Sequence, residues 1–325
     1  MGLNHTYSGL QVCHEHADGV VVAVSYLYSE TDDKRFSVSS QETILESSLK
    51  AGIEHTHVCG GKARCSTCRV EVIEGLSHCL PRNEAEQAMG SRLGLPETIR
   101  LACQTRVNGD VKIRRLAVDD LDARIIKDQL TGQNDNSMGR EKEVAVLFTD
   151  LANYTEFAES LPAYDVVHVL NRYYQTMNAI VTEHGGVISD VAGDGMLILF
   201  GACKKEHGLV LDAVHTVRAM HKELDRFNEY LMSMYGRSFG LRAGINHGPA
   251  IIGHFSTGPM SKVAAIGDTV NLASRIEQAN KAFGSQLLIS ESAYQHIKGD
   301  IEISASHQTH LKGKTGLYDL YEVQI

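Results

Sequence analysis

The sequence predicts a two-domain protein of the α+β fold class. At 325 residues the chain is longer than a single hydrophobic core usually supports. Its longest apolar runs, Val20–Val24 and Met196–Phe200, have the length of strands. The hydrophobic period changes across the polar segment Thr131–Arg140, from short elements around a cysteine-rich loop to longer helices between strands. We therefore expect an N-terminal extension at residues 1–19, domains at 20–115 and 142–325, and a helical and flexible linker at 116–141.

The composition and the charge exclude several classes of protein. Hydrophobic residues make up 43% of the chain and charged residues 22%, as in globular proteins. No apolar run approaches the roughly 18–20 residues that cross a bilayer. No basic segment precedes an apolar stretch near Met1, so we see no export signal. The net charge of −9 argues against nucleic acid or an anionic membrane as the main partner, and we expect a cytoplasmic protein.

Short strands and helices alternate through the N-terminal half. The segments Val20–Ser29 and Arg35–Val38 are β-branched and aromatic and flank a polar stretch, which is typical of a hairpin. Apolar residues within Glu42–Ala51 have helical spacing, and Gly52 ends that helix. The remaining expected elements are a helix at residues 82–92 and strands at Arg69–Ile73 and Val111–Ile113.

The segment between the two halves combines a helical pattern with a polar stretch. Leu116–Leu130 repeats apolar residues with the spacing of an amphipathic helix. Thr131–Arg140, which reads Thr-Gly-Gln-Asn-Asp-Asn-Ser-Met-Gly-Arg, is the most linker-like stretch of the chain. The pattern therefore predicts a connecting helix followed by a flexible linker.

Longer elements follow in the C-terminal half. Asp165–His184 repeats apolar residues with the helical period and ends at Gly185-Gly186. Val187–Val191 and Met196–Phe200 flank a turn that contains Asp-Gly, a strong hairpin signal. Such an order predicts helices packed against a largely antiparallel sheet. The other expected elements are strands at Val144–Phe148, Gln286–Ile289, Tyr318–Val323 and, meeting at His247-Gly248-Pro249, Phe239–Asn246 and Ala250–Phe255, with helices at Leu209–Leu231 and Thr269–Phe283.

The cysteines indicate a metal centre. Seven cysteines in a chain without an export signal argue against a disulfide framework. An iron–sulfur cluster needs four deprotonated sulfurs that converge on two irons, and glycines in the loop let backbone amides turn toward the sulfur. A structural zinc site is the alternative, although such sites usually contain two Cys-x2-Cys pairs. The proposed ligands, spaced C-x5-C-x2-C…C, are Cys59, Cys65, Cys68 and Cys103, and we expect Cys13, Cys79 and Cys203 to be half-buried thiols.

Residues 18–115 resemble the adrenodoxin-like branch of [2Fe–2S] ferredoxins. The resemblance rests on the Cys-Gly-Gly loop, on Thr-Cys-Arg-Val before a strand and on Arg-Leu-Ala-Cys-Gln around Cys103. It implies a β-grasp ferredoxin domain with a [2Fe–2S] loop and a [2Fe–2S] cofactor on the four cysteines. A redox partner protein is a possible consequence of such a domain.

The C-terminal half contains residues suited to phosphoryl transfer, which needs metal ions, a phosphate cradle and a cation for the developing charge. Asp150 follows the strand Val144–Phe148, and Asp194 lies in the predicted hairpin turn. If these strand ends lie side by side, the two carboxylates converge on a pair of Mg2+ ions. The backbone amides of Leu151–Thr155 enter a helix and could hold a triphosphate. Three further candidates are Asn271 and Arg275, which share one helix face, and Lys312 in Leu-Lys-Gly-Lys.

In this order, these residues resemble class III adenylate/guanylate cyclases over residues 142–325. The motif Ile-Gly-Asp-Thr-Val-Asn-Leu-Ala-Ser-Arg is highly specific to that family, and the segments 184–195 and 242–248 support it. The family implies a ferredoxin-like α/β sandwich and a head-to-tail homodimer with two active sites shared between the chains. Asn153 departs from a frequent glycine, but Asn tolerates unusual backbone angles.

The resemblance also implies a role for each candidate. Asp150, Asp194 and the Leu151 carbonyl would hold two Mg2+ (or Mn2+) ions. Asn271 of the second chain would orient the ribose, and its Arg275 would stabilise the α-phosphate transition state. The remaining substrate contacts are Asn153, Tyr154 and Thr155 at the phosphates, and Lys312 of the second chain at the β- and γ-phosphates.

Two positions bear on the choice of base. Asp190 stands where adenylate cyclases usually have Lys, and Ala264 stands where they usually have Asp or Thr. A carboxylate accepts from the N1–H and 2-amino group of guanine, and it also accepts from the 6-amino group of adenine. Residue chemistry slightly favours GTP, whereas the preponderance of adenylate cyclases among bacterial-looking members favours ATP. We predict an adenylate cyclase, with a guanylate cyclase as the alternative.

Other functions remain as alternatives. The chain could be a ferredoxin-type electron carrier whose cyclase-like domain only dimerises, but a degenerate cyclase is expected to have lost a metal or transition-state residue, and none is lost here. A diguanylate cyclase is rejected because Ala192–Gly195 does not match the Gly-Gly-Asp/Glu-Glu-Phe turn of that family. For the active enzyme, we expect the redox state or integrity of the cluster to regulate catalysis, with the helix Leu116–Leu130 biasing how the two sites close.

Overall fold

The computed structural model describes residues 24–116, 139–203, 207–257 and 260–325. The chain divides between Gln133 and Asn134 into two compact units, each with its own core. The predicted helix Leu116–Leu130 and most of the predicted linker lie outside the described residues. Each unit is considered by itself below.

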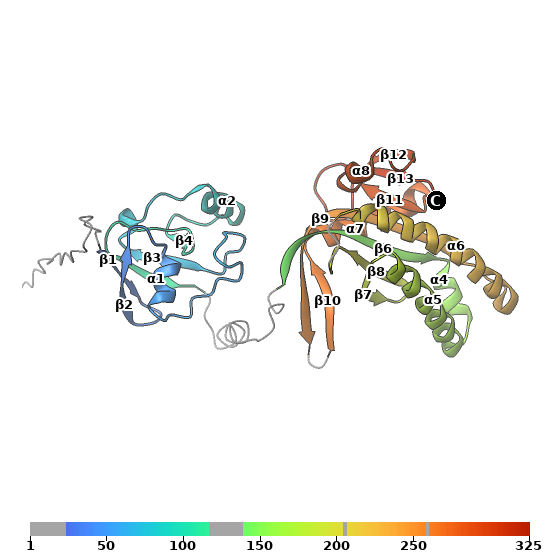
Figure 1. Ribbon diagram of the computed structural model, residues 1–325, viewed down its shortest axis with the longest axis horizontal. Coiled ribbons are helices and arrows are strands. Elements are labelled where there is room, and N and C mark those ends of the chain that lie inside the picture. The colour runs from blue at the N-terminus through green and yellow to red at the C-terminus, as the bar shows by residue number, and fades with distance from the viewer. Residues whose placement is uncertain (1–23, 117–138, 204–206, 258–259) are drawn as a thin grey trace, which may run out of the picture. The chain divides into compact units, whose positions relative to one another are not determined.

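The described residues of the N-terminal unit form a five-stranded mixed sheet with two helices (Figure 1). The strands lie in the order β2-β1-β5-β3-β4, and β1 pairs antiparallel with β2 and parallel with β5. The predicted hairpin, both helices and the strands at β3 and β5 are confirmed, whereas the three-residue β4 was not predicted. The elements are β1 (Val24–Ser29), β2 (Lys34–Ser39), α1 (Ile44–Lys50), β3 (Arg69–Glu74), a 3-10 turn (Leu76–His78), α2 (Glu84–Leu93), β4 (Ile99–Leu101) and β5 (Val111–Arg115).

Local chemistry explains where the first helix begins and what ties the second helix to the sheet. Thr43 caps α1, because its side chain accepts from the Glu46 N–H while the Glu46 carboxylate accepts from the Thr43 N–H. On α2, the buried Glu86 forms a two-pronged ion pair with Arg100 and also accepts from the Leu101 N–H. These contacts hold the segment before Cys103 against the core.

The C-terminal unit is an eight-stranded, largely antiparallel sheet with helices on both faces. The strands run β12-β13-β11-β9-β6-β8-β7, and β10 pairs with β9. The α+β class and the ferredoxin-like sandwich are confirmed. The elements are β6 (Arg140–Ala152), α4 (Tyr154–Ser160), α5 (Ala163–Glu183), β7 (Val187–Ala192), β8 (Gly195–Phe200), α6 (Leu209–Tyr235), β9 (Gly240–Thr257), β10 (Met260–Ile266), α7 (Asp268–Phe283), β11 (Leu287–Ser290), α8 (Glu291–Ile297), β12 (Ile303–Thr309) and β13 (Tyr318–Val323).

The central strand β6 is buried on both faces. Ala145 and Leu147 face the core under α5, α6 and α8, while Val144 and Val146 face a second core under α7. Figure 1 shows α5 and α6 running beside each other along the sheet. Because both faces of β6 pack against helices, the position of Asp150 near the end of this strand is fixed.

The predicted break at His247-Gly248-Pro249 is wrong, because β9 is one strand that pairs with β6 from Gly240 to Ile252. Pro249 has no N–H to donate, and at this point β9 has no paired strand on the edge opposite β6. On that edge β11 pairs only with residues 243–245 of β9, and β10 begins at Ile251. The missing donor therefore costs no ladder hydrogen bond. The elements β10, α8 and β12 were not predicted.

A largely buried histidine next to this segment makes stability depend on pH. The His247 ring contacts the ring of the exposed His296 in a tilted arrangement, with 3.9 Å between ring centroids, and the His247 side chain is 11% exposed. Burial, and then the neighbouring His296, lowers the pKa of His247 to about 4. A histidine in an unfolded chain has a pKa near 6.5. Between pH 4 and pH 6.5 the unfolded chain therefore binds more protons than the folded chain.

We expect the C-terminal unit to lose up to about 3 kcal/mol of unfolding free energy as the pH falls from 6.5 to 4. Glu143, 3.9 Å from His247, would offset part of this loss where it is ionised. Denaturant titrations of the wild type and of His247→Gln at several pH values measure the slope, with the exposed His168→Gln as the control. Equal slopes for all three proteins would show that His247 is not the responsible group.

Candidate active site

The cysteine loop between α1 and β3 is shaped by residues with left-handed backbone angles. Gly60, Gly61 and Ala63 have φ values of 67°, 80° and 53°. Turns of this kind aim successive N–H groups toward a common point. The backbone N–H groups of Lys62, Arg64 and Cys65 accordingly lower the pKa of the Cys59 thiol.

The four predicted cluster cysteines form two pairs of thiols, and within the described residues no three of them converge on one metal position. The Cys59 thiol interacts with that of Cys65, and the Cys68 thiol interacts with that of Cys103. The first pair is half-buried, whereas Cys68 and Cys103 are only 1% and 7% exposed. Two pairs of soft ligands surrounded by backbone donors fit a cluster in which each iron takes two cysteines.

The contacts within the loop shift the thiol pKa values. The interaction between Cys68 and Cys103 raises the pKa of Cys68 and lowers the pKa of Cys103 to about 6. Burial alone would raise the pKa of Cys59, but the Cys65 thiol and three backbone N–H groups lower it. Gln104 donates to the Cys103 sulfur and to the Gly61 carbonyl, and so joins the fourth ligand to the loop. Such an environment favours thiolates, the form that binds iron.

The other cysteines differ from one another. Cys79 is half-buried beside the N-terminal core, as predicted, and burial raises its pKa. The expectation for Cys203 is wrong, because this thiol is exposed in the turn after β8. The neighbouring Ala202 packs against the core under α7, while the Cys203 side chain lies in solvent. Cys13 lies outside the described residues.

In the C-terminal unit, β6 and the β7–β8 hairpin bring two aspartates together. Asp150 lies near the end of β6, and Asp194 lies in the turn between Ala192 and Gly195. The two carboxyl groups lie close enough to interact, and the Leu151 N–H donates to Asp194 at 3.0 Å. Burial, and then the neighbouring carboxyl group of Asp150, raises the pKa of Asp194 to about 6.

Two carboxylates beside the backbone of Leu151 form a set of hard oxygen donors, which fits Mg2+ or Mn2+. Like charges held this close repel each other unless a cation lies between them. In the part of the chain that the structure describes, no three His, Cys, Asp or Glu side chains converge on one metal position.

Two residues at this site were missed by the sequence analysis. Arg242 on β9 stands opposite Asp150 in the sheet register and donates to it at 2.7 Å. Glu277 on α7 is buried and lies 3.9 Å from the Arg242 guanidinium. Arg242 opens the motif Arg-Ala-Gly-Ile-Asn-His-Gly, which was a usable signal, whereas the partner of Glu277 depends on how α7 packs.

The predicted phosphate loop follows Asp150 directly. Asn153 has a φ of 71°, which agrees with the expectation that an unusual backbone angle is needed there. Tyr154 and Thr155 begin the short helix α4. Thr155 is exposed, while the ring of Tyr154 packs against Phe239.

The predicted transition-state residues form a separate group on α7 and in the loop before β13. Asn271 is exposed one turn before Arg275, whose guanidinium donates to Gln278. Lys312 is exposed in a loop that Lys314 ties to Asp268 at the start of α7. Arg275 stands about 200° around the helix from Glu277, so it points away from the aspartates of its own chain.

The two predicted base-reading positions lie near each other. Asp190 is on β7 and Ala264 is on β10. Their neighbours in sequence are joined, because the Ser189 hydroxyl donates to the Val263 carbonyl at 2.8 Å. The structure therefore brings positions 190 and 264 to the same part of the sheet.

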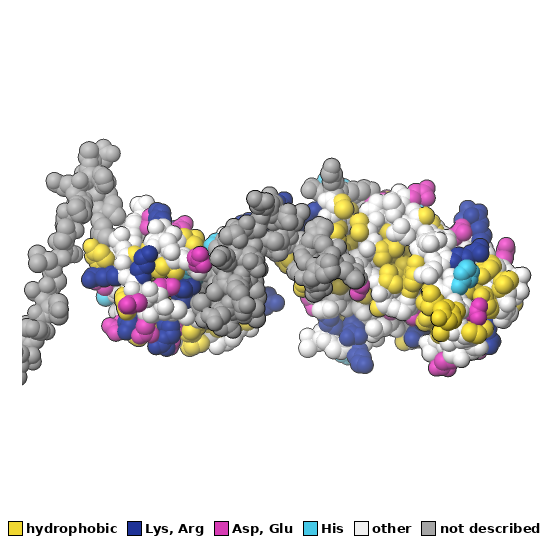
Figure 2. Space-filling view, turned by 90° about the horizontal axis from the view of Figure 1, so that it is seen from below, with side chains coloured by type: hydrophobic (Ala, Val, Ile, Leu, Met, Phe, Trp, Pro, Cys, Tyr) yellow, Lys and Arg dark blue, Asp and Glu magenta, His cyan; other side chains and the backbone are white. Residues whose placement is uncertain are grey.

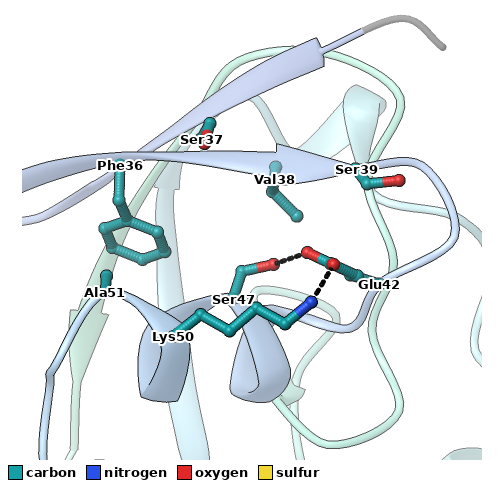
Figure 3. Close-up of a pocket in the computed structure, with 8 residues that line it drawn as sticks. All are labelled: Phe36, Ser37, Val38, Ser39, Glu42, Ser47, Lys50 and Ala51. Carbon is teal, nitrogen blue, oxygen red and sulfur yellow. Dashed lines mark hydrogen bonds and ion pairs between the residues drawn. The ribbon is translucent and has the colours of Figure 1, made fainter. Parts of the chain in front are cut away.

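A pocket of about 330 Å³ lies elsewhere, between β2 and α1 of the N-terminal unit (Figure 3). Its polar side chains are engaged with one another, because Ser47 donates to Glu42 at 3.1 Å and Lys50 pairs with the same carboxylate. The pocket contains none of the predicted site residues. Within the described ranges, no helix is both long and apolar enough to cross a membrane.

Comparisons with known proteins agree with both units. The family model described as adenylate and guanylate cyclase catalytic domain matches residues 137–323, and that of the 2Fe-2S iron-sulfur cluster binding domain matches residues 28–108. Adenylate cyclase 1 of Rhizobium meliloti (strain 1021) is 29% identical over 182 residues, which are 56% of this chain and 27% of that protein. This chain thus matches only a minor part of that relative.

Solved structures include cyclases of both kinds. The guanylyl cyclase Cya2 is 28% identical with a TM-score of 0.53, and the alignment covers 57% of this chain and 93% of that chain. The adenylyl cyclase CyaB from P. aeruginosa is 29% identical with a TM-score of 0.53, covering 57% and 95%. The iron–sulfur match supports the cluster over the zinc alternative. Since the first family match spans more than half of the sequence, the chain belongs to the adenylate and guanylate cyclase catalytic domain family and carries an N-terminal 2Fe-2S cluster binding domain.

Proposed function

We propose that this chain converts ATP to 3′,5′-cyclic AMP and pyrophosphate and that its [2Fe–2S] domain regulates the reaction. The carboxylate pair of Asp150 and Asp194, placed by β6 and the β7–β8 hairpin, is the observation that carries the proposal. Its members and the Leu151 carbonyl would hold two Mg2+ or Mn2+ ions. Bound there, the ions activate the 3′-hydroxyl and offset the charge that develops on the phosphates.

The other residues orient the substrate and stabilise the transition state. Asn271 of the second subunit holds the ribose, its Arg275 donates to the α-phosphate, and its Lys312 pairs with the β- and γ-phosphates. The 3′-oxygen forms a bond to the α-phosphorus as the bond to pyrophosphate breaks. Asn153, Tyr154 and Thr155 present the start of α4 to the triphosphate.

A homodimer is supported by the direction of Arg275 and by the surface. Arg275 points away from Asp150 of its own chain, so a site that needs both takes them from two chains. Figure 2 shows hydrophobic side chains exposed on one face of the C-terminal unit. On β7, β9 and β10 and in the loop before β13, the exposed apolar residues are Val191, Ile251, Ile266 and Leu317, which a second copy would cover.

The function is tested with the full chain, purified with its cluster, and with ATP or GTP and Mg2+ or Mn2+. Product identity is measured on protein held oxidised and then reduced. Cyclic AMP formation at rates that differ between the two redox states supports the proposal. Equal rates for oxidised, reduced and cluster-free protein would remove the regulatory role, and no cyclic product with either nucleotide would remove catalysis.

Guanylate cyclase activity is the second candidate, because Asp190 and Ala264 are not the usual adenine-reading pair. We expect the double change Asp190→Lys and Ala264→Asp to raise the ratio of kcat/KM for ATP over GTP by about tenfold or more. Lysine removes the acceptor that guanine uses, and aspartate supplies one for the adenine amino group. Steady-state kinetics with both nucleotides measure the ratio. A ratio unchanged by the double substitution would show that these positions do not read the base.

A further inference from the structure

Arg242 lies between two carboxylates and is shared unequally by them. Its Nη2 donates to Asp150 Oδ2 at 2.7 Å, while its Nε is 3.9 Å from Glu277 Oε1. The first distance is a short charge-assisted hydrogen bond, and the second is an ion pair without a hydrogen bond. Arg242 is therefore engaged by Asp150 and only approached by Glu277.

The contact between Arg242 and Glu277 is incomplete on both sides. Glu277 is 8% exposed, and neither its Oε1 nor the Arg242 Nε has a hydrogen-bond partner in the protein. Burial, and then the charge of Asp150, raises the pKa of Glu277 to about 7. A buried polar atom without a partner is unfavourable, so both atoms gain when they meet. A shift of about 1 Å would bring them to hydrogen-bond distance.

The geometry assigns that movement to the arginine. A Cβ on Gly244 would lie 2.2 Å from the Glu277 backbone nitrogen, so α7 is pressed directly against β9. Asn280 donates to the Ala243 carbonyl at 2.9 Å and fixes the same contact. The backbones of Glu277 and Arg242 are therefore fixed, and the gap between their side chains closes through side-chain torsions, of which Arg242 has more than Glu277.

A divalent ion on Asp150 competes with Arg242 for the same carboxylate, since both are cations that need its oxygens. A guanidinium displaced from Asp150 would be a buried charge without a partner unless another acceptor is at hand. Glu277 is that acceptor in the described part of the site. The exchange keeps Arg242 neutralised while Asp150 accepts the ion.

We propose that Glu277 is a positioning residue that receives Arg242 when Asp150 binds a divalent ion, and thereby sets the metal affinity of the site. The inference rests on the proposed function, because it takes Asp150 as a metal ligand. Glu277 itself touches neither the ion nor the substrate. Its effect passes through Arg242, and a double-mutant cycle separates this path from a direct charge effect.

The test measures Mn2+ binding by electron paramagnetic resonance, on the full chain without nucleotide. Glu277→Gln is expected to raise the Mn2+ dissociation constant by about fivefold to tenfold, since Arg242 then stays on Asp150. In an Arg242→Met background, the same substitution should change the constant by less than about twofold. The exposed Glu302→Gln, which removes one surface charge from the same unit, controls for net charge.

Three outcomes would overturn the proposal. Glu277→Gln could bind Mn2+ like the wild type, or its full effect could persist in Arg242→Met, which would indicate simple electrostatics. If Asp150→Asn leaves Mn2+ binding unchanged, the proposed metal site itself is wrong and the inference falls with it. Should Glu277→Gln fail to fold, Glu277→Asp keeps the charge but shortens the reach, and it is expected to weaken binding in the same direction.

Discussion

Mixing Asp150→Asn subunits with Arg275→Ala subunits is expected to restore about a quarter of the wild-type cyclase activity, although each variant alone is inactive. Asp150 belongs to the metal half of the site, and Arg275 belongs to the transition-state half. In a dimer of one subunit of each kind, both defects fall in the same active site and the other site is intact. Random pairing makes about half of the dimers mixed, with one working site of two.

Each single defect is expected to lower kcat by about a hundredfold to a thousandfold or more. Asp150→Asn removes a charged ligand from the carboxylate pair, and Arg275→Ala removes a donor aimed at the developing charge. Losses of this size make a recovery to a quarter of the wild-type rate easy to detect. The measurement is product formation by co-expressed, differently tagged subunits, and purification through both tags selects the mixed dimers and raises the expected activity to about half of the wild-type rate.

The matched control mixes Asp150→Asn with Asp194→Asn. Both residues lie in the same half of the site, so every dimer of these two subunits has two broken sites and no recovery is expected. If the first mixture also stays inactive while both tags are recovered together, each chain builds its site alone. Recovery in both mixtures would mean that one of the aspartates is not needed.

Replacing Cys68 with Ser is expected to abolish cluster binding, whereas Cys79→Ser should retain it. Cys68 is 1% exposed and interacts with Cys103 within the buried thiol pair. A serine oxygen is a harder and much less acidic ligand than a thiolate, and it does not replace the sulfur on iron. Cys79 lies outside the thiol pairs, so its loss removes only a half-buried side chain.

Iron and acid-labile sulfide content, with the visible absorption of the cluster, measure the result on protein purified without air. We expect Cys68→Ser to retain less than about one tenth of the wild-type iron. Because a core substitution can also unfold the domain, Cys65→Ser at the half-exposed pair serves as a second variant. Wild-type iron content in both variants would contradict the ligand set, and loss of iron in Cys79→Ser would extend it.

Much of the fold could be predicted from local patterns. The hairpin at Val187–Val191 and Met196–Phe200 was predicted because Asp-Gly at a turn leaves few other conformations. The long helix ending at Gly185 was predicted because its apolar residues follow one face. Elements with weaker patterns, such as β10 and β12, were missed. In β12 the side chains only alternate between half-buried and exposed, so its sequence contains few apolar residues.

The continuation of β9 through Pro249 could not be predicted from the local sequence. Proline usually ends a strand, but here β9 continues because the edge at Pro249 has no partner that needs an N–H. That edge depends on where β10 and β11 pair, which involves residues far apart in the chain. No local signal contains this information.

The sequence alone determined the two kinds of chemistry in this protein. Thiolate spacing around Cys59–Cys68 has few other uses, because an iron–sulfur cluster requires four sulfur ligands. The aspartates after strand ends predict a metal site only together with the other motifs of the C-terminal half. Tertiary structure decided which cysteines pair and which residue shares Asp150. It placed Arg242 on Asp150 through strand register and Glu277 beside Arg242 through the contact of α7 with Gly244. The sequence shows which residues are charged, but only the packed structure decides which of them form pairs.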